Sequence, residues 1–278
     1  MNDNLTLSQR RQVGHLDNAV VPNAHGLFIG AGRAIGKLEW LASTGIRHFT
    51  IIDPGTVEAE NIGQSGYTIE DLGRSKVEAA ERHIRLFCPG AEISAIAAKH
   101  SDVPNLRDLM RKADFVCDGA DDLAVAANLA AHACAVGADV VHIRTTELSD
   151  QFIIAGTLKR SGAPGCVRCR LKSAFDALEI GFEPAPFYPS FRLVPERLNL
   201  YAAWIMLGLI HARNDQSISL GIEEIGRHFL KHPAWVGLNS VHSSGEIFPI
   251  KQYREPRSSG WTCPVCGTRA EDLDLEGA

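Results

Sequence analysis

Glycine and aspartate residues stand where they could contact a phosphate group and its attached sugar. Gly30 and Gly32 follow a short apolar run, and a helical pattern begins directly after them. Glycine lets the backbone approach an anion without a Cβ clash, and a helix N-terminus presents free N–H groups. Asp53 ends the next apolar run, where a carboxylate can accept hydrogen bonds from ribose hydroxyls. This stretch therefore predicts a nucleotide site.

The spacing of the glycines departs from the dinucleotide-binding pattern GxGxxG. The third glycine would fall at Ile35, whereas Gly36 comes one residue later. A glycine-rich turn between a strand and a helix can also serve packing alone, and this alternative remains open. Arg33 and Lys37 follow the turn, where they could meet phosphate or form the solvated face of the helix.

Three acidic residues follow a buried apolar run and precede a helical pattern. They are Asp118, Asp121 and Asp122. Mg²⁺ binds one or two protein carboxylates together with substrate phosphates, so this cluster is a candidate magnesium site. Asp118 or Asp122 could instead cap the following helix, which leaves Asp121 as the expected metal ligand.

Lys76 lies in the first turn of a predicted helix that Ser75 can cap. A cation is unfavourable there because the helix dipole is positive at its N-terminus. Its position therefore suggests a contact with phosphate, although a solvated lysine would show the same pattern.

Two CxxC pairs carry a separate kind of chemistry. Each CxxC turn can supply two thiolates, and four thiolates complete a tetrahedral zinc site with no open position for catalysis. We expect a structural zinc rather than redox pairs, because glycine and proline flank both turns. Such a metal would fasten the C-terminus to the middle of the chain. The four predicted ligands are Cys166, Cys169, Cys263 and Cys266.

Strand and helix patterns alternate up to about residue 145, which predicts a Rossmann-like α/β fold with a doubly wound, mostly parallel sheet. Two antiparallel strands around residues 243–245 would extend the sheet, and the zinc site would staple this C-terminal extension. Residues 61–73 and 171–191 are expected to be loops. Strands are predicted at 27–29, 48–52, 92–97, 113–117, 139–144 and 151–157, and helices at 33–44, 75–87, 103–112, 123–136, 194–211 and 221–231.

Composition narrows the function classes. The chain has 278 residues, is 45% hydrophobic and carries a net charge of -5. This charge argues against a nucleic-acid-binding surface, and no apolar run is expected to reach the ~20 residues of a membrane span. The first residues lack the apolar core of a signal peptide, so a cytoplasmic protein is expected. We divide the chain into an arm (1–25), a nucleotide-binding domain (26–160) and a zinc-stapled part (161–278), and we expect these parts to form one continuous domain.

The ordered set of motifs resembles the ThiF/MoeB-type adenylyltransferases, which are related to ubiquitin-activating enzymes. The resemblance covers most of residues 10 to 268. The matching landmarks are Arg11-Gln12, the turn at Gly30 and Gly32, Asp53 with Val57, Asn61-Ile62, Asp71-Leu72-Gly73 before Lys76, Asp118 to Asp122, Gln151-Phe-Ile-Ile, Arg257 and the two CxxC pairs.

The resemblance implies ATP- and Mg²⁺-dependent adenylation of a carboxylate at the C-terminus of a peptide or small ubiquitin-like protein, carried out by a homodimer. It implies that the glycine turn and Lys76 hold phosphate, Asp53 the ribose and Asp121 the magnesium. It also implies that Arg11, or Arg10, reaches the site of the partner subunit. The nucleotide-binding set that it implies is Gly30, Gly32, Gly36, Asp53, Asn61, Gln64 and Lys76.

Two family arginines are replaced in this chain, by Gln64 and by Ala126. Each lost cation could lower the rate on the order of 10²-fold. A second hypothesis is therefore a catalytically weakened relative that binds a partner as a scaffold. A third, an NAD-dependent oxidoreductase, would share the strand–helix–strand unit but does not account for Lys76, Asp121 or the zinc site. Residues 171–191 contain no cysteine, which disfavours a thioester step.

Overall fold

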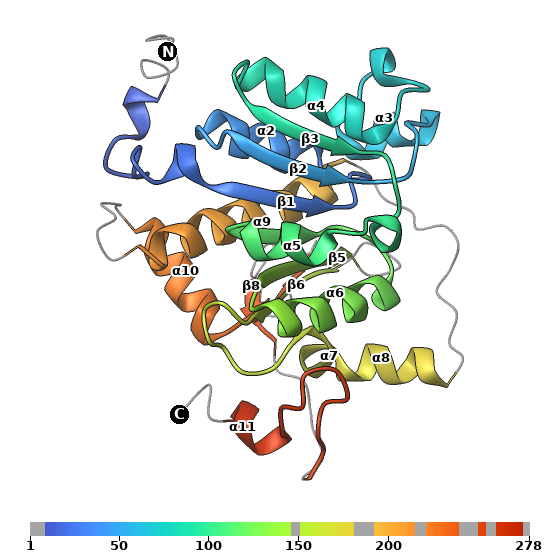
Figure 1. The fold of residues 1–278 in the computed structure, drawn as a ribbon, viewed down its shortest axis with the longest axis vertical. Coiled ribbons are helices and arrows are strands. Elements are labelled where there is room, and N and C mark those ends of the chain that lie inside the picture. Colours follow the sequence, from blue (N-terminus) through green and yellow to red (C-terminus); the bar gives the residue numbers. More distant parts are fainter. Residues whose placement is uncertain are drawn as a thin grey trace.

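The structure is a computed structural model that describes residues 9–145, 151–180, 192–214, 221–238, 250–253 and 260–274. Its centre is an eight-stranded sheet with the order β3-β2-β1-β4-β5-β6-β7-β8 (Figure 1). The strands are β1 (His25–Ile29), β2 (His48–Ile52), β3 (Glu92–Ile96), β4 (Phe115–Asp118), β5 (Asp139–Thr145), β6 (Gln151–Leu158), β7 (Ala234–Leu238) and β8 (Ile250–Gln252).

The first five strands are parallel, and β6, β7 and β8 add an antiparallel edge. This confirms the predicted doubly wound, mostly parallel sheet with an antiparallel extension. The order in which the strands are added reverses at β1, because β2 pairs with one edge of β1 and β4 pairs with the other. Ligand crevices in such sheets open at the carboxyl ends of the strands beside this reversal, here after Ile29 and Asp118.

Helices cover both faces of the sheet. In Figure 1, α5 (Leu106–Lys112) and α6 (Leu123–Val136) lie in front of it, and four longer helices lie behind. Parallel strands buried on both faces read as continuous apolar runs, as β1 and β4 do. The helices behind are α2 (Ile35–Ser43), α4 (Lys76–Phe87), α9 (Leu193–Ala212) and α10 (Ile222–Lys231).

Helix α9 corrects one expectation from composition. It has 20 residues and a mean hydropathy of 1.2, so by length and composition alone it could cross a membrane. However, 67% of its apolar window is buried inside the protein. It crosses α10 closely, since a Cβ at Gly226 would lie 2.1 Å from the carbonyl oxygen of Gly208. Within this structure α9 is a core helix.

Two predicted loops contain helices. Helix α3 (Ala59–Ser65) begins at a capping box, in which Asn61 accepts a hydrogen bond from the backbone of Glu58. Helix α8 (Lys172–Glu179) is stabilised by ion pairs of Lys172 and Arg168 with Asp176. The first stretch was predicted to be a loop because of its polar residues, and the second because of its prolines. The rest of the predicted loop (181–191) and the turn at 243–245 lie outside the described residues.

The remaining elements are short. They are η1 (Arg10–Gln12), η2 (Val21–Asn23), η3 (Ile69–Asp71), η4 (His100–Asp102), α7 (Val167–Arg170) and α11 (Ala270–Asp274).

Candidate functional site

The turn after β1 packs against the loop after β4. Gly30 has φ +87, and a Cβ there would lie 2.9 Å from the backbone nitrogen of Ala120. Glycine at this position is therefore required both by the left-handed backbone and by the close approach of the two loops. Gly32 differs, because a Cβ there would meet no atom within 4 Å. The turn is thus packed against the loop after β4 at Gly30, and it faces open space at Gly32.

Asp53 ties the end of β2 to this turn. Its Oδ2 accepts a hydrogen bond from the N–H of Ala31 at 2.7 Å, and its Oδ1 accepts one from the N–H of Gly55 at 2.7 Å. Within the described part of the chain, the N–H groups of Gly32 and Arg33 have no acceptor. Free N–H groups beside a helix N-terminus form an anion-binding arrangement.

Tyr67, in the segment before α4, contacts the glycine turn, and Lys76, the first residue of α4, contacts the loop after Asp53. The N–H of Lys76 donates to the carbonyl oxygen of Gly55 at 2.9 Å. A Cβ at Gly55 would lie 3.4 Å from Lys76 Nζ and 3.0 Å from Asp53 Oδ1, so the ammonium and the carboxylate flank one glycine. Tyr67 donates its hydroxyl to the carbonyl oxygen of Ala31 at 2.7 Å. Burial raises the pKa of Tyr67, which keeps this donor protonated.

A cluster of charged residues packs against Tyr67, whose ring lies edge-on to the ring of His83. The ring of His83 lies between Glu39 Oε1, at 2.7 Å, and Asp71 Oδ2, at 2.9 Å. The hydrogen bond with Glu39 raises the pKa of His83. Burial alone would raise the pKa of Asp71, but hydrogen bonds from His83, Thr68 and Arg82 hold it well below its usual value. The imidazolium and carboxylate therefore fix this segment against the glycine turn.

The three acids after β4 have different environments. Asp118 is fully buried and accepts hydrogen bonds from His142 at 2.7 Å and from Arg144 at 3.2 Å. Burial lowers the pKa of His142. Asp122 caps α6 by accepting from the N–H of Ala124 at 2.7 Å. Asp121 is exposed and pairs with Arg33 at 2.9 Å. Asp121 is thus the acid of this cluster that contacts the glycine turn.

Lys37 lies beneath the turn rather than on a solvated face. It is only 1% exposed, and burial lowers the pKa of its ammonium group. Its Nζ donates to Asn199 Oδ1 at 3.2 Å, and Asn199 Nδ2 donates to the carbonyl oxygen of Arg33 at 2.7 Å. Helix α9 thereby anchors the start of α2.

Sequence patterns do not single out Tyr67 or Asn199. The available signal for Asn199 is an amide within a strongly apolar helix, because a buried amide needs hydrogen-bond partners. Tyr67 has no such signal, since it stands in a polar segment.

The contacts of Gly36, Asn61 and Gln64 in the structure are with the protein's own helices. A Cβ at Gly36 would lie 2.1 Å from Glu196 Oε2, so its lack of a side chain allows α9 to pack against α2. The side chain of Asn61 closes the capping box of α3, and Gln64 is half-buried in the same helix. Their predicted contact with a nucleotide remains a prediction.

Arg11 lies at the opposite end of the sheet from the glycine turn. Its neighbour Gln12 donates to the carbonyl oxygen of Thr44, at the C-terminus of α2, at 2.7 Å. Figure 1 shows this N-terminal segment beside the amino ends of the strands. Arg11 is exposed and is not part of the site in its own chain. A role for it in a partner's site stays a prediction.

The four predicted cysteine ligands form one cluster, whose sulfur atoms all lie within 4.8 Å of one another. Cys166 Sγ lies 3.9 Å from Cys169 Sγ and 3.7 Å from Cys263 Sγ, and Cys169 Sγ lies 3.4 Å from Cys266 Sγ. Zn–S bonds of ~2.3 Å at tetrahedral angles place sulfur atoms about 3.8 Å apart. The donor set and its spacing fit a closed zinc site.

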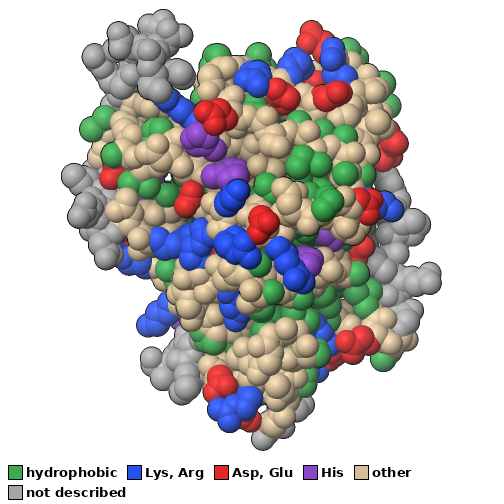
Figure 2. All heavy atoms as spheres, in the orientation of Figure 1, with side chains coloured by type: hydrophobic (Ala, Val, Ile, Leu, Met, Phe, Trp, Pro, Cys, Tyr) green, Lys and Arg blue, Asp and Glu red, His purple; other side chains and the backbone are tan. Residues whose placement is uncertain are grey.

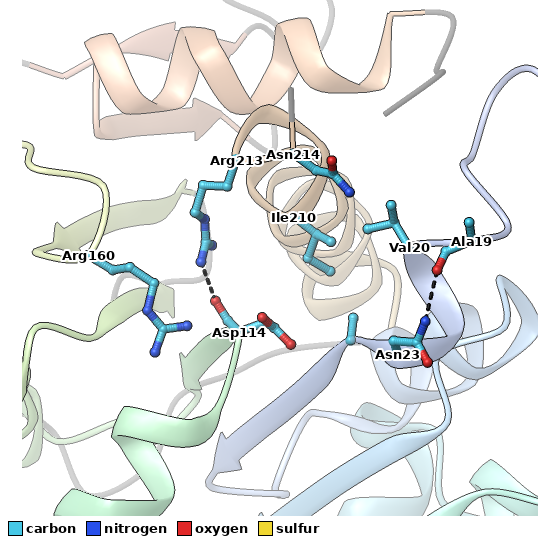
Figure 3. A pocket seen from close by; sticks show the side chains of 9 residues that line it. Ala19, Val20, Asn23, Asp114, Arg160, Ile210, Arg213 and Asn214 are labelled. Atoms are coloured by element: carbon cyan, nitrogen blue, oxygen red, sulfur yellow. Dashed lines mark hydrogen bonds between the residues drawn. The ribbon is translucent and has the colours of Figure 1, made fainter. Parts of the chain in front are cut away.

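A cavity of about 820 Å³ lies near the amino ends of β1 and β4 and is lined partly by Arg160, Arg213 and Asp114 (Figure 3). Arg213 donates to the carbonyl oxygen of Asp114 at 2.6 Å, and Arg160 donates to that of Ala113 at 2.6 Å. Both arginines are thus bonded to the backbone. Parallel sheets bind ligands at the other end, so we assign no ligand to this cavity.

The face covered by α5 carries a row of Lys and Arg side chains (Figure 2). Some of these cations have partners on the protein, as Arg111 pairs with Asp108 and Arg107 donates to His132. The net charge of the chain is negative, and the absence of a nucleic-acid partner stays a prediction.

Comparisons with known proteins decide the family. The ThiF family profile matches residues 7–184, which is more than half of the chain. The chain belongs to the ThiF family. No curated protein matches it at a significant level.

Solved structures of ThiF-family proteins show the same fold. Escherichia coli MccB is 18% identical with a TM-score of 0.62, over 90% of this chain and 67% of that one. Its complex with ATP is also 18% identical, with a TM-score of 0.60 over 90% of this chain and 69% of that one. PaaA is 14% identical with a TM-score of 0.65, over 91% of this chain and 84% of that one.

Proposed function

We propose that this protein uses ATP and Mg²⁺ to adenylate the C-terminal carboxylate of a peptide or small ubiquitin-like protein. Membership of the ThiF family supports adenylation in general. The observation that carries the proposal is the grouping of Asp53, Asp121 and the free N–H groups of Gly32 and Arg33 at the carboxyl ends of β1, β2 and β4, with Lys76 beside Asp53 at Gly55.

These residues can perform the chemistry of adenylation. A substrate carboxylate oxygen forms a bond to the α-phosphorus of ATP, and the bond from that phosphorus to the bridging oxygen breaks, releasing pyrophosphate. Lys76 and the free N–H groups can stabilise the charge on the phosphate oxygens. Asp53 retains acceptor capacity for ribose hydroxyls. A magnesium ion would neutralise phosphate charge, with Asp121 as a protein ligand.

Pyrophosphate exchange into ATP tests the proposal. The exchange should depend on Mg²⁺ and on an added peptide with a free C-terminal carboxylate. Asp121→Ala should abolish Mg·ATP-dependent exchange and leave the fold intact, which circular dichroism can verify. Unchanged exchange in this variant would remove the proposed metal role. Nucleotide binding without any exchange would instead favour the scaffold hypothesis.

A peptide substrate is favoured by solved complexes of MccB with MccA. Candidate substrates are therefore peptides of varied length with a free C-terminus and small ubiquitin-like proteins. Calorimetric titration with ATP and with NAD separates the adenylation hypothesis from the oxidoreductase hypothesis, because only the former predicts a preference for ATP.

The other parts of the proposal are a structural zinc at the four cysteines, a homodimer and a cytoplasmic location. The sulfur spacing of the cysteine cluster supports the first. Arg11 lies near the C-terminal end of α2, whereas the glycine turn of its own chain precedes the N-terminal end of that helix. This position is consistent with a contribution of Arg11 to a second subunit. Sedimentation velocity measures the oligomeric state directly.

A further inference from the structure

The guanidinium group of Arg33 links the ends of three strands. It donates to Thr145 Oγ1, at the end of β5, at 2.7 Å and pairs with Asp121 Oδ2, in the loop after β4, at 2.9 Å. Its own backbone belongs to the glycine turn after β1. The side chain therefore bridges the carboxyl ends of these strands, where the proposed function places the triphosphate.

The main chain of Arg33 is fixed, but open space lies beside it. Asn199 of α9 holds its carbonyl group, and Asn199 is itself buried and bonded to Lys37. The N–H of Arg33 has no acceptor within the described part of the chain, and the neighbouring Gly32 faces empty space. A change in the partners of Arg33 thus requires only rotation of its side chain.

The ion pair of Arg33 with Asp121 stabilises the fold only weakly, because both side chains are accessible to water. The Arg33 side chain is 22% exposed and that of Asp121 is 44% exposed. Ion pairs that water can reach stabilise little, and a phosphate can form two parallel hydrogen bonds with one guanidinium group. The pair of Arg144 with Asp118 is a contrast, because the Asp118 side chain is fully buried and the Arg144 side chain is only 9% exposed.

We propose that Arg33 exchanges Asp121 for the phosphates of ATP when the nucleotide binds. The exchange gives the phosphates a guanidinium group and leaves the Asp121 carboxylate available to magnesium. Arg33 thereby supplies a cation that positions 64 and 126, occupied by glutamine and alanine, do not supply. This inference rests on the proposed function and names a further catalytic residue for it.

Calorimetric titration of the full, zinc-containing chain tests the exchange without relying on activity. Titrations use ATP with Mg²⁺ and ATP in metal-free buffer without chelator. Arg33→Gln should weaken the binding of Mg·ATP by about 10- to 100-fold, the effect of losing a hydrogen bond between charged groups. Arg74→Gln is the matched control and should change it less than about threefold, because Arg74 is exposed and donates to the backbone of Glu70.

The decisive measurement is the coupling between the two partners. Asp121→Asn removes the competitor for Arg33, so metal-free ATP should bind about two- to fivefold more tightly. This gain should vanish when Arg33→Gln is also present. Asp122→Asn removes the same charge next to Asp121 and keeps the helix cap, so it should give little gain.

Each outcome decides a separate point. Equal gains from Asp121→Asn and Asp122→Asn, or a gain that persists without Arg33, would overturn the exchange. Wild-type affinity in a folded Arg33→Gln variant would overturn the role of Arg33 and leave the proposed function standing. Failure of the wild-type chain to bind ATP at all would reject both. Near-ultraviolet circular dichroism confirms that each variant is folded.

Discussion

The glycine-turn crevice and the four-cysteine cluster both join segments that are distant in sequence, but they differ in exposure and in charge. Beside the glycine turn, the side chains of Asp121 and Arg33 are accessible to water and pair with each other. In the cluster, Cys166 and Cys169 are fully buried and their neighbours are other thiols. A group bound in the crevice can enter and leave, whereas a metal in the cluster becomes part of the fold.

Loss of one zinc ligand should have the largest effect on stability. Cys263→Ser should reduce the zinc content to near zero and lower the free energy of unfolding by on the order of 5 kcal/mol, because folding and metal binding are coupled at such sites. Atomic absorption and denaturant unfolding measure the two quantities. Cys134→Ser, which changes a half-buried cysteine outside the cluster, should retain zinc. Full zinc content in Cys263→Ser would contradict the assignment.

The second-largest loss of stability is expected in the charged cluster of Asp71, His83 and Arg82. Asp71→Asn should lower the free energy of unfolding by about 3 kcal/mol, because it removes the fully buried carboxylate that His83 and Arg82 share and leaves them only the more exposed Glu39 and Glu70. Urea unfolding near neutral pH measures the change. A loss below about 1 kcal/mol would mean that the cluster contributes no more than an exposed ion pair does.

His83 makes part of this stability dependent on pH. Because its pKa is raised in the folded protein, its contribution is fully present below the unfolded pKa of about 6.5 and is lost as pH rises through the folded pKa. His83→Gln should therefore cost about 2 kcal/mol at pH 6 and less at pH 9. A cost that stays constant between these pH values would show that the ring acts by packing alone.

The smallest effect on stability is expected in the crevice itself. Asp121→Asn should change the free energy of unfolding by less than about 1 kcal/mol, since its ion pair is exposed, while strongly reducing Mg²⁺-dependent exchange. Thermal unfolding and pyrophosphate exchange, measured on the same preparation, compare the two effects. A large loss of stability would place Asp121 with the structural residues rather than with the site.

Sequence patterns predicted an element correctly where residues close together in the chain determine it. Helix α6 occupies the predicted residues 123–136, because Asp122 caps it and Gly137 ends it in a left-handed conformation. The cysteine cluster also followed from spacing, since each CxxC turn brings its own two sulfur atoms together. Helices α3 and α8 were missed because their stabilising contacts involve polar side chains that also occur in loops.

The candidate site could be predicted only as a set of separate residues. Asp53 was expected to meet a ribose, and in the fold its carboxylate also holds the N–H of Ala31. Arg33 had two open interpretations, and its pairing with Asp121 depends on the parallel pairing of β1 with β4. Lys37 was a candidate for phosphate contact, but it is buried and its ammonium group donates to Asn199 of α9.

The order of apolar runs, glycines and acids was enough to predict a mostly parallel α/β sheet with a glycine turn after its first strand, because strand and helix periodicity and turn chemistry act over a few residues. The partners of Arg33, Lys37, Tyr67 and Asp71 depended on the tertiary structure. Each contacts a residue that is distant along the chain, and such contacts are set by packing between elements rather than by sequence neighbours.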